Sequence, residues 1–379
     1  MDDDYIFPKE RKVAYFFNEK TFNYHYGKGQ PMKPHRLALT HSLVLEYGMH
    51  TKMRLYRTQS ATFDELCAFH TKEYVGFLAR ASETPTSVEE HEIAAYTLTP
   101  DTPIFGGVYD FCSSYSGSSL SAARHLCSGS GEDIAVNWSG GFHHGRKIGP
   151  YGFCYVNDIV LAIIELLKHH ERVLYIDIDI HHGDGVQDAF YTTDRVMTIS
   201  FHKHAPNFFP GTGAPEETGV GDGTNHSINV PLGDGIDDHG YAFIFQPAIR
   251  CAVETYRPGA IVMQCGADCL AEDKLGAFNL SIKGHGECLA FVKSLGIPLL
   301  VVGGGGYTTR NVARCWTYDT SVLLETPLSD TIPDGPYAEY FEPGYKLHSD
   351  LLPTIENKNT RKSLEQLRKQ VLETIRRIG

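Results

Sequence analysis

The chain has 379 residues, of which 42% are hydrophobic and 21% charged, and a formal net charge of −12 at pH 7. This composition is that of an ordinary globular protein, built as two average domains or as one large α/β domain. The negative charge argues against a nucleic-acid-binding protein and is compatible with a basic substrate or partner. No apolar run approaches the length of a membrane span.

Two features bear on the compartment. The nine cysteines are scattered, odd in number and lack a CxxC pair, which is typical of reduced thiols in the cytosol or nucleus. Residues 1–4 (MDDD) are acidic where a signal peptide would be basic and then apolar. We therefore expect a protein of the nucleus, the cytoplasm or both, without a secretory or transmembrane segment.

Strand and helix patterns alternate along the chain. Apolar runs rich in β-formers predict strands at 12–17, 53–57, 134–138, 196–201, 226–231, 260–265 and 298–302, and one that begins at 173. Helices are expected after 32–36 and at 61–70, 72–81, 107–126, 156–169, 184–191, 237–256, 281–295, 309–325 and 361–378. Segment 82–105 has little periodicity and is predicted to be an exposed loop. The last helix should dock through one apolar stripe, formed by Leu364, Leu367, Val371, Ile375 and Ile378.

This alternation, without an internal repeat or a linker, predicts an α/β fold with parallel strands and helices on both faces of the sheet, in one domain. Ligand sites in such sheets lie outside the carboxyl ends of the strands. Four polar groups fall at such ends: the pair at 143–144, the stretch 177–184, Asp268, and the glycines before Tyr307. They should therefore converge.

The stretch 172–185, RVLYIDIDIHHGDG, indicates a metal site. Its first half is a strand buried on both faces. Side chains two apart share one face of a strand, so Asp177, Asp179 and His181 should point the same way at its end. Buried carboxylates need a compensating cation. Asp179, His181 and Asp268 would leave coordination positions open, which is typical of a catalytic metal; zinc suits these ligands, and iron(II) or another divalent ion stays open.

The remaining polar groups suit acid–base chemistry. His143 and His144 can reach the same cavity, and Asp177 and Asp184 can orient them through Nδ1, which should raise imidazole basicity. A single buried histidine of this kind would more often be a core residue with its ring nitrogens hydrogen-bonded. Tyr307 follows four glycines and could donate a hydrogen bond to an oxyanion, although a core tyrosine is the simpler alternative.

Phe153, which follows Gly152, could face Phe208 or Phe209 and form a slot for an unbranched alkyl chain, although aromatic loop residues usually serve packing. Together with a metal, a base and an oxyanion donor, such a slot predicts hydrolysis of an amide on a long alkyl chain.

The motifs resemble those of class I zinc-dependent histone deacetylases, over about residues 13–325. They are PMKPHR, NWSGGFHH, GFCYVNDIV, RVLYIDIDIHHGDGV, SFHK, FFPGTG, QCGAD, GHGE and GGGGYTTRNVARCW. The resemblance implies the arginase/deacetylase type of α/β fold. It also implies a single domain over 1–379, with a catalytic part at about 13–325 and a C-terminal docking segment at about 326–379. The implied activity is removal of acetyl groups from lysines of histone tails and other proteins, linked to transcriptional repression in chromatin.

By matching positions, the resemblance implies one zinc ion per chain on Asp179, His181 and Asp268. His144 would be the main general base and acid with Asp184 behind it, Asp177 would stand behind His143, and Tyr307 would polarise the acetyl carbonyl. The residues implied to bind the substrate are Asp101 at the rim and Gly152, Phe153, Phe209 and Leu275 along the lysine tunnel.

Further sites follow from the same resemblance. A structural potassium ion would use Asp177, Asp179, His181, Ser200 and Phe201, and a second one Phe190, Thr193, Val196 and His226. An internal acetate cavity would be lined by Arg36, Phe142 and Cys154. Corepressor subunits would be bridged by an inositol phosphate at His25, Gly29, Lys33, Lys283 and Arg310, where Lys283 replaces the usual arginine and loses its bidentate fork.

The chain departs from the family pattern around the pocket mouth, at 144–151, at Thr102 and in the loop 214–225. These departures bear on substrate preference rather than on the chemistry. Two other hypotheses stay open. One is a manganese ureohydrolase or an acetylpolyamine amidohydrolase on the same fold, and the other is a chromatin scaffold without activity.

Overall fold

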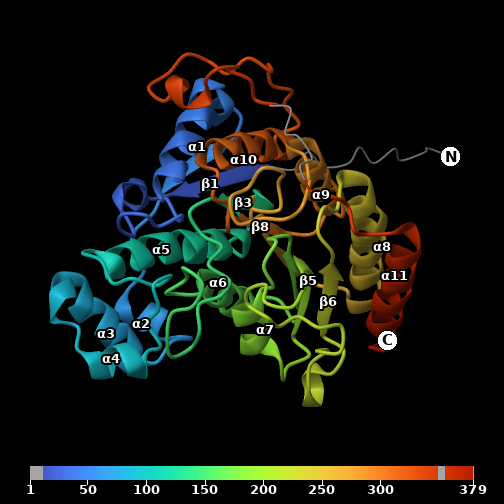
Figure 1. The fold of residues 1–379 in the computed structure, drawn as a ribbon, viewed down its shortest axis with the longest axis horizontal. Coiled ribbons are helices and arrows are strands. Elements are labelled where there is room, and N and C mark those ends of the chain that lie inside the picture. The colour runs from blue at the N-terminus through green and yellow to red at the C-terminus, as the bar shows by residue number, and fades with distance from the viewer. Residues whose placement is uncertain (1–11, 349–354, 379) are drawn as a thin grey trace.

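The computed structural model describes residues 12–348 and 355–378, so the acidic residues 1–4 lie outside the described part. Eight strands form one sheet in the order β2-β1-β3-β8-β7-β4-β5-β6, and all neighbouring strands are parallel (Figure 1). The strands are β1 (Val13–Phe17), β2 (Arg54–Arg57), β3 (Ile134–Asn137), β4 (Val173–Asp177), β5 (Val196–Lys203), β6 (Ser227–Leu232), β7 (Ala260–Gln264) and β8 (Leu299–Val302). The predicted parallel α/β sheet is confirmed.

Helices cover both faces of the sheet. One face carries α5 (Val108–Leu126), α6 (Asp158–Leu166) and α7 (Asp184–Phe190), and the other α1 (His35–Glu46), α8 (Asp238–Tyr256), α9 (Ile282–Ser294) and α10 (Thr309–Leu323). Strand β4 shows the division: Val173 and Tyr175 pack toward α5–α7, and Leu174 and Ile176 toward α8–α10. Since both faces are apolar, the central strands are buried on both sides, as parallel sheets require.

The C-terminal helix α11 (Arg361–Arg376) lies against α8 beside the edge strand β6 (Figure 1). Leu364, Val371 and Ile375 are buried there, and Leu367 and Ile378 are partly buried against the same core. The predicted docking stripe is therefore confirmed. Within residues 12–348 and 355–378, no helix combines the length and the apolar character needed to cross a membrane.

The prediction of a loop over 82–105 is wrong in part. Helix α3 (Lys72–Glu83) runs into this segment, and α4 (Glu90–Ala95) lies within it. Helix α4 is too short to show a helical period, and a reciprocal capping box between Glu89 and Glu92 stabilises its start. The remaining helices are α2 (Phe63–Leu66) and the 3₁₀ turns Glu19–Asn23, Met49–Thr51, Pro85–Ser87, Gly221–Gly223 and Ala338–Phe341.

Strand β4 ends at Asp177, so Asp177, Asp179 and His181 do not share one face of a continuous strand as expected. Each carboxylate instead accepts a hydrogen bond from the backbone two residues on. The Asp179 amide donates to Asp177 Oδ1 at 3.1 Å, and the His181 amide donates to Asp179 Oδ1 at 3.0 Å. These bonds satisfy the backbone outside the sheet and bend the chain there.

Candidate metal centre and catalytic site

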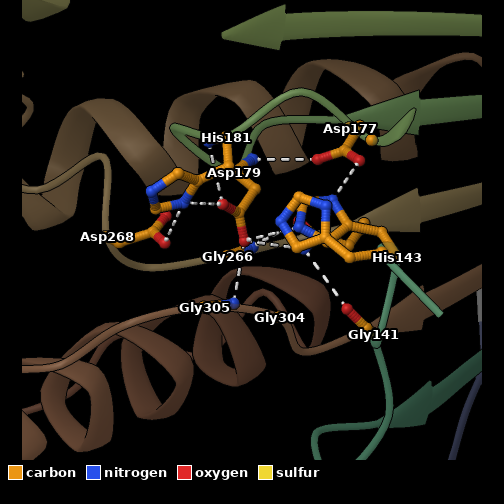
Figure 2. A network of polar contacts seen from close by, with 12 residues as sticks. Gly141, His143, Asp177, Asp179, His181, Gly266, Asp268, Gly304 and Gly305 are labelled. Carbon is orange, nitrogen blue, oxygen red and sulfur yellow. Dashed lines mark hydrogen bonds and ion pairs between the residues drawn. The ribbon is translucent and has the colours of Figure 1, made fainter. Parts of the chain in front are cut away.

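The four polar groups predicted to converge do so. Strands β3, β8, β7 and β4 are consecutive in the sheet and parallel, so their carboxyl ends meet at one edge. Figure 2 shows Asp179 between two sets of side chains that come from different strand ends: His181 and Asp268 on one side, and His143 on the other. The topology of the sheet therefore assembles the site from segments more than 160 residues apart.

Asp179, His181 and Asp268 can offer ligand atoms that all lie within 4.8 Å of one another, and all three are buried. The Nδ1 atom of His181 is 3.1 Å from Asp179 Oδ1 and 3.2 Å from Asp268 Oδ2. Two carboxylate oxygens and one imidazole nitrogen are a zinc ligand set that leaves positions for water and substrate.

The electrostatics of these three residues call for a cation. Burial raises the pKa of Asp268, and the negative charge of Asp179 raises it further. Burial also acts to raise the pKa of Asp179, but the neighbouring His143 and His181 outweigh it and hold this pKa well below its usual value. Two buried carboxylates therefore face each other beside these imidazoles, and a divalent ion would relieve their repulsion. The residues present fit zinc.

Two groups that the sequence pattern did not indicate fix Asp179. Its Oδ2 accepts a hydrogen bond from Gln264 Nε2 at 2.8 Å. It also accepts one from the Gly305 amide at 2.8 Å (Figure 2). A side chain at position 305 would collide with the ligands, since its Cβ would lie 2.0 Å from Asp268 Oδ2. The motifs QCGAD and GGGG carry these residues, but the pairing of Gln264 with Asp179 depends on the register of β7 against β4.

Each member of the histidine pair has its own aspartate. His143 Nδ1 is 2.8 Å from Asp177 Oδ2, and His144 Nδ1 is 2.6 Å from Asp184 Oδ1. The two rings lie 3.9 Å apart, centroid to centroid. The predicted pairings are therefore present, with a hydrogen bond that fixes the orientation of each ring.

The two histidines differ in basicity. Burial lowers the pKa of His143, but Asp177 and Asp179 outweigh it and raise that pKa to about 9. For His144, burial and the charge on His143 outweigh Asp184 and lower the pKa to about 4. The paired aspartate acts to raise the pKa of each histidine, as expected, but in His144 burial and the charge of His143 outweigh Asp184, because two adjacent buried imidazoles resist carrying two charges.

Tyr307 is buried beside the metal ligands. Its backbone amide donates to Asp273 Oδ2 at 2.7 Å, and its ring packs 5.7 Å from that of Phe153. Burial and the charges of Asp268 and Asp179 raise the pKa of its phenol well above the usual value, so the phenol keeps its proton. Arg36 holds the glycine run before it by donating to the carbonyls of Gly304 and Gly306, both at 2.5 Å.

A cavity of about 310 Å³ leads to His144 and His181. All of the residues expected to bind substrate line it, and Pro31 and Phe208 complete the wall. Asp101 is exposed at the rim, and Leu275 is 39% exposed. The lining residues are Pro31, Asp101, His144, Gly152, Phe153, His181, Phe208, Phe209 and Leu275.

The other predicted sites lie apart from this cavity or beneath it. Phe142 and Cys154 are buried in one apolar cluster with Phe153 and Tyr307, and Arg36 is buried against the glycine run before Tyr307. Ser200 and Phe201 are buried on β5, while Phe190, Thr193, Val196 and His226 lie around the amino ends of β5 and β6. On the surface, Lys33 is partly exposed, and the other members of the predicted inositol phosphate group are exposed: His25, Gly29, Lys283 and Arg310.

Comparison with known proteins agrees with this geometry. The family model "Histone deacetylase domain" matches residues 30–323. "Histone deacetylase B" of Dictyostelium discoideum is 54% identical over 369 residues, covering 96% of this chain and 87% of that protein. "Type-1 histone deacetylase 1" of the same organism is 51% identical, covering 97% and 74%, and "Probable histone deacetylase 19" of Zea mays is 51% identical, covering 96% and 70%. The resemblance inferred from the motifs is confirmed: the chain belongs to the histone deacetylase family.

Proposed function

We propose that this histone deacetylase hydrolyses N6-acetyl-lysine on histone tails and other proteins with one zinc ion on Asp179, His181 and Asp268. The observation that carries the proposal is the position of this ligand set, which lies at the end of an apolar pocket and beside two His–Asp dyads. The family match supports the same activity.

Zinc at this position would act as a Lewis acid toward the acetyl carbonyl and the attacking water. The chain supplies the proton transfers. His144 is neutral at pH 7, its Nδ1 is held by Asp184, and its Nε2 can accept a proton from water. His143, whose pKa is raised by the neighbouring carboxylates of Asp177 and Asp179, would hold a proton for the departing lysine amine. Environments that separate two pKa values in this way divide acid and base roles.

Tyr307 stabilises the developing negative charge. Because its phenol stays protonated, it can donate a hydrogen bond to the acetyl oxygen as charge builds there. The Asp273 and Arg36 contacts fix the backbone on both sides of this residue, so the donor is positioned before substrate arrives.

The pocket suits an acylated lysine. Phe153, Phe209 and Leu275 would enclose the alkyl stem, and Gly152 leaves room between them. The exposed carboxylate of Asp101 would hold backbone N–H groups of the peptide at the rim. A net charge of −12 favours the approach of basic histone tails.

The remaining expectations are part of the same proposal. Structural potassium would occupy the two sets of residues around β5, and acetate would leave past Arg36, Phe142 and Cys154. Corepressor subunits would bind near Lys283 and Arg310, with an inositol phosphate between the proteins. The protein would then work in the nucleus, the cytoplasm or both as a single domain with a docked C-terminal segment.

Metal dependence tests this function. Purified chain would be assayed on an acetylated histone-tail peptide before chelation, after chelation and after addition of zinc, with bound metal counted by mass spectrometry. We expect one zinc per chain, loss of turnover on chelation and recovery with zinc. Full turnover in metal-free protein, or two manganese ions per chain, would contradict the proposal.

A further inference from the structure

Arg146 contacts both the catalytic dyad and the pocket wall. It lies two residues after His144, in the loop 144–151 where the sequence departs from the family pattern. Its guanidinium forms ion pairs with Asp184 and with Asp188 of α7, and it stacks over the ring of Tyr151 at 5.0 Å. The Arg146 side chain is 33% exposed, whereas that of Asp184 is 1% exposed.

The contact with Asp184 completes the hydrogen bonding of a buried carboxylate. Asp184 Oδ1 accepts from His144 Nδ1 at 2.6 Å and from the Gly185 amide at 2.8 Å. Asp184 Oδ2 accepts from Arg146. With both oxygens held, the carboxylate cannot rotate, and the imidazole of His144 is fixed against it. Loss of the guanidinium would leave Oδ2 buried without its charged partner, which is costly.

The contact with Tyr151 supports the pocket wall. The Tyr151 ring packs 4.8 Å from that of Phe209, and Phe209 lines the cavity. The His144 ring also lies nearly perpendicular to that of Tyr151, with the centroids 6.2 Å apart. Arg146 therefore lies behind the base on one side and behind the wall on the other.

The loop that carries Arg146 is itself held in place. The Arg146 amide donates to the Gly149 carbonyl at 3.0 Å, and the Thr71 amide donates to the Lys147 carbonyl at 3.1 Å. A planar guanidinium can bind two carboxylates and stack on a ring at once, whereas a lysine ammonium cannot reproduce that geometry.

We propose that Arg146 is a positioning residue that aligns His144 through Asp184 and sets the width of the acyl tunnel through Tyr151 and Phe209. The inference rests on the proposed role of His144. It predicts that one surface-reaching side chain affects both turnover and the choice between short and longer acyl groups. If Arg146 served only to form an ion pair with Asp188, replacing it would change neither turnover nor the preference between acyl groups.

The test compares Arg146→Gln and Arg146→Lys with Asp188→Asn, which keeps the Asp184 contact. The values of kcat and KM would be measured on acetyl-lysine and butyryl-lysine peptides, with bound zinc and Tm recorded for each variant. Arg146→Gln should lower kcat on acetyl-lysine by roughly 10–100-fold, the usual effect of removing a group that orients a site residue. It should also raise the butyryl-to-acetyl ratio of kcat/KM, while Asp188→Asn stays near wild type in both.

Arg146→Lys should keep the charge near Asp184 but lose the stacking on Tyr151, so its kcat should be partly restored while the acyl ratio stays altered. This variant carries the test if Arg146→Gln does not fold. Equal losses in Asp188→Asn and Arg146→Gln, or wild-type kinetics in Arg146→Lys, would overturn the inference. No turnover by zinc-loaded wild type would instead count against the proposed function.

Discussion

The floor and the mouth of the pocket are built differently. On the floor, Asp179 and Asp268 are fully buried at strand ends, and each accepts hydrogen bonds from groups on other strands or loops. At the mouth, Asp101 and Leu275 are exposed. Positions on the floor are dictated by the convergence of parallel strands, whereas positions at the mouth depend on loops particular to this chain. Changes to the floor should therefore abolish chemistry, and changes to the mouth should adjust preference.

The largest effect is expected from Gly305→Ala. The added Cβ would lie 2.0 Å from Asp268 Oδ2 and 2.9 Å from Asp179 Oδ2, so the ligands must move apart. We expect loss of bound zinc and no detectable turnover. Metal analysis and a deacetylation assay check this, and a variant that keeps its zinc and its turnover would show that the floor is not rigid.

A second effect concerns His70, which lies outside the cavity lining, packs against Tyr74 and is 2% exposed. Its Nε2 accepts from the Asn157 amide at 3.0 Å, and burial lowers its pKa to about 4. Because this pKa lies below that of His70 in the unfolded chain, His70 is protonated at a higher pH in the unfolded state than in the folded state as the pH falls. The stability contributed by neutral His70 is present above about pH 6.5 and is lost as the pH falls toward 4, by about 3 kcal/mol in total.

The variant His70→Gln tests this pH dependence of stability, because the glutamine amide oxygen can accept the hydrogen bond from the Asn157 amide without titrating. Denaturant unfolding at several values of pH should show a shallower loss of stability between pH 6.5 and 4 in the variant than in wild type. Parallel curves would show that His70 does not titrate in this range.

A smaller effect is expected from Leu275→Ala at the mouth. The side chain is 39% exposed, so its removal takes away only part of an apolar contact with the substrate stem. We expect KM for an acetyl-lysine peptide to rise by a few-fold, about 1 kcal/mol or less, with kcat unchanged. A fall in kcat of the size expected for a floor residue would break the distinction between the two regions.

The smallest effect is expected from Gly76→Ala, the control for Gly305→Ala. Gly76 lies within α3, and an added Cβ would meet no atom within 4 Å. Alanine should stabilise the helix by ~0.5–1 kcal/mol and leave zinc content and turnover unchanged. A loss of activity here would mean that glycine replacement itself, rather than a clash with the ligands, disables the enzyme.

The strand pattern grouped the residues of the floor, whereas those of the mouth were identified through the family motifs, for physical reasons. Strand ends of a parallel sheet meet at one edge, so His143, Asp179 and Asp268 could be grouped before any contact was known. The low pKa of His144 could not be predicted, because it depends on burial and on the charge of its neighbour. Helix α4 was missed because six residues show no period, and the role of Arg146 depends on a loop conformation that residue types alone do not determine.

The most direct test of the account is the turnover of Tyr307→Phe on an acetyl-lysine peptide, with zinc content and Tm measured beside wild type. The change removes one hydroxyl and keeps the ring against Phe153. We expect a fall in kcat of roughly 10²–10³-fold at unchanged zinc content, because one oxyanion donor is lost. A folded, zinc-loaded variant with the kcat of wild type would contradict it.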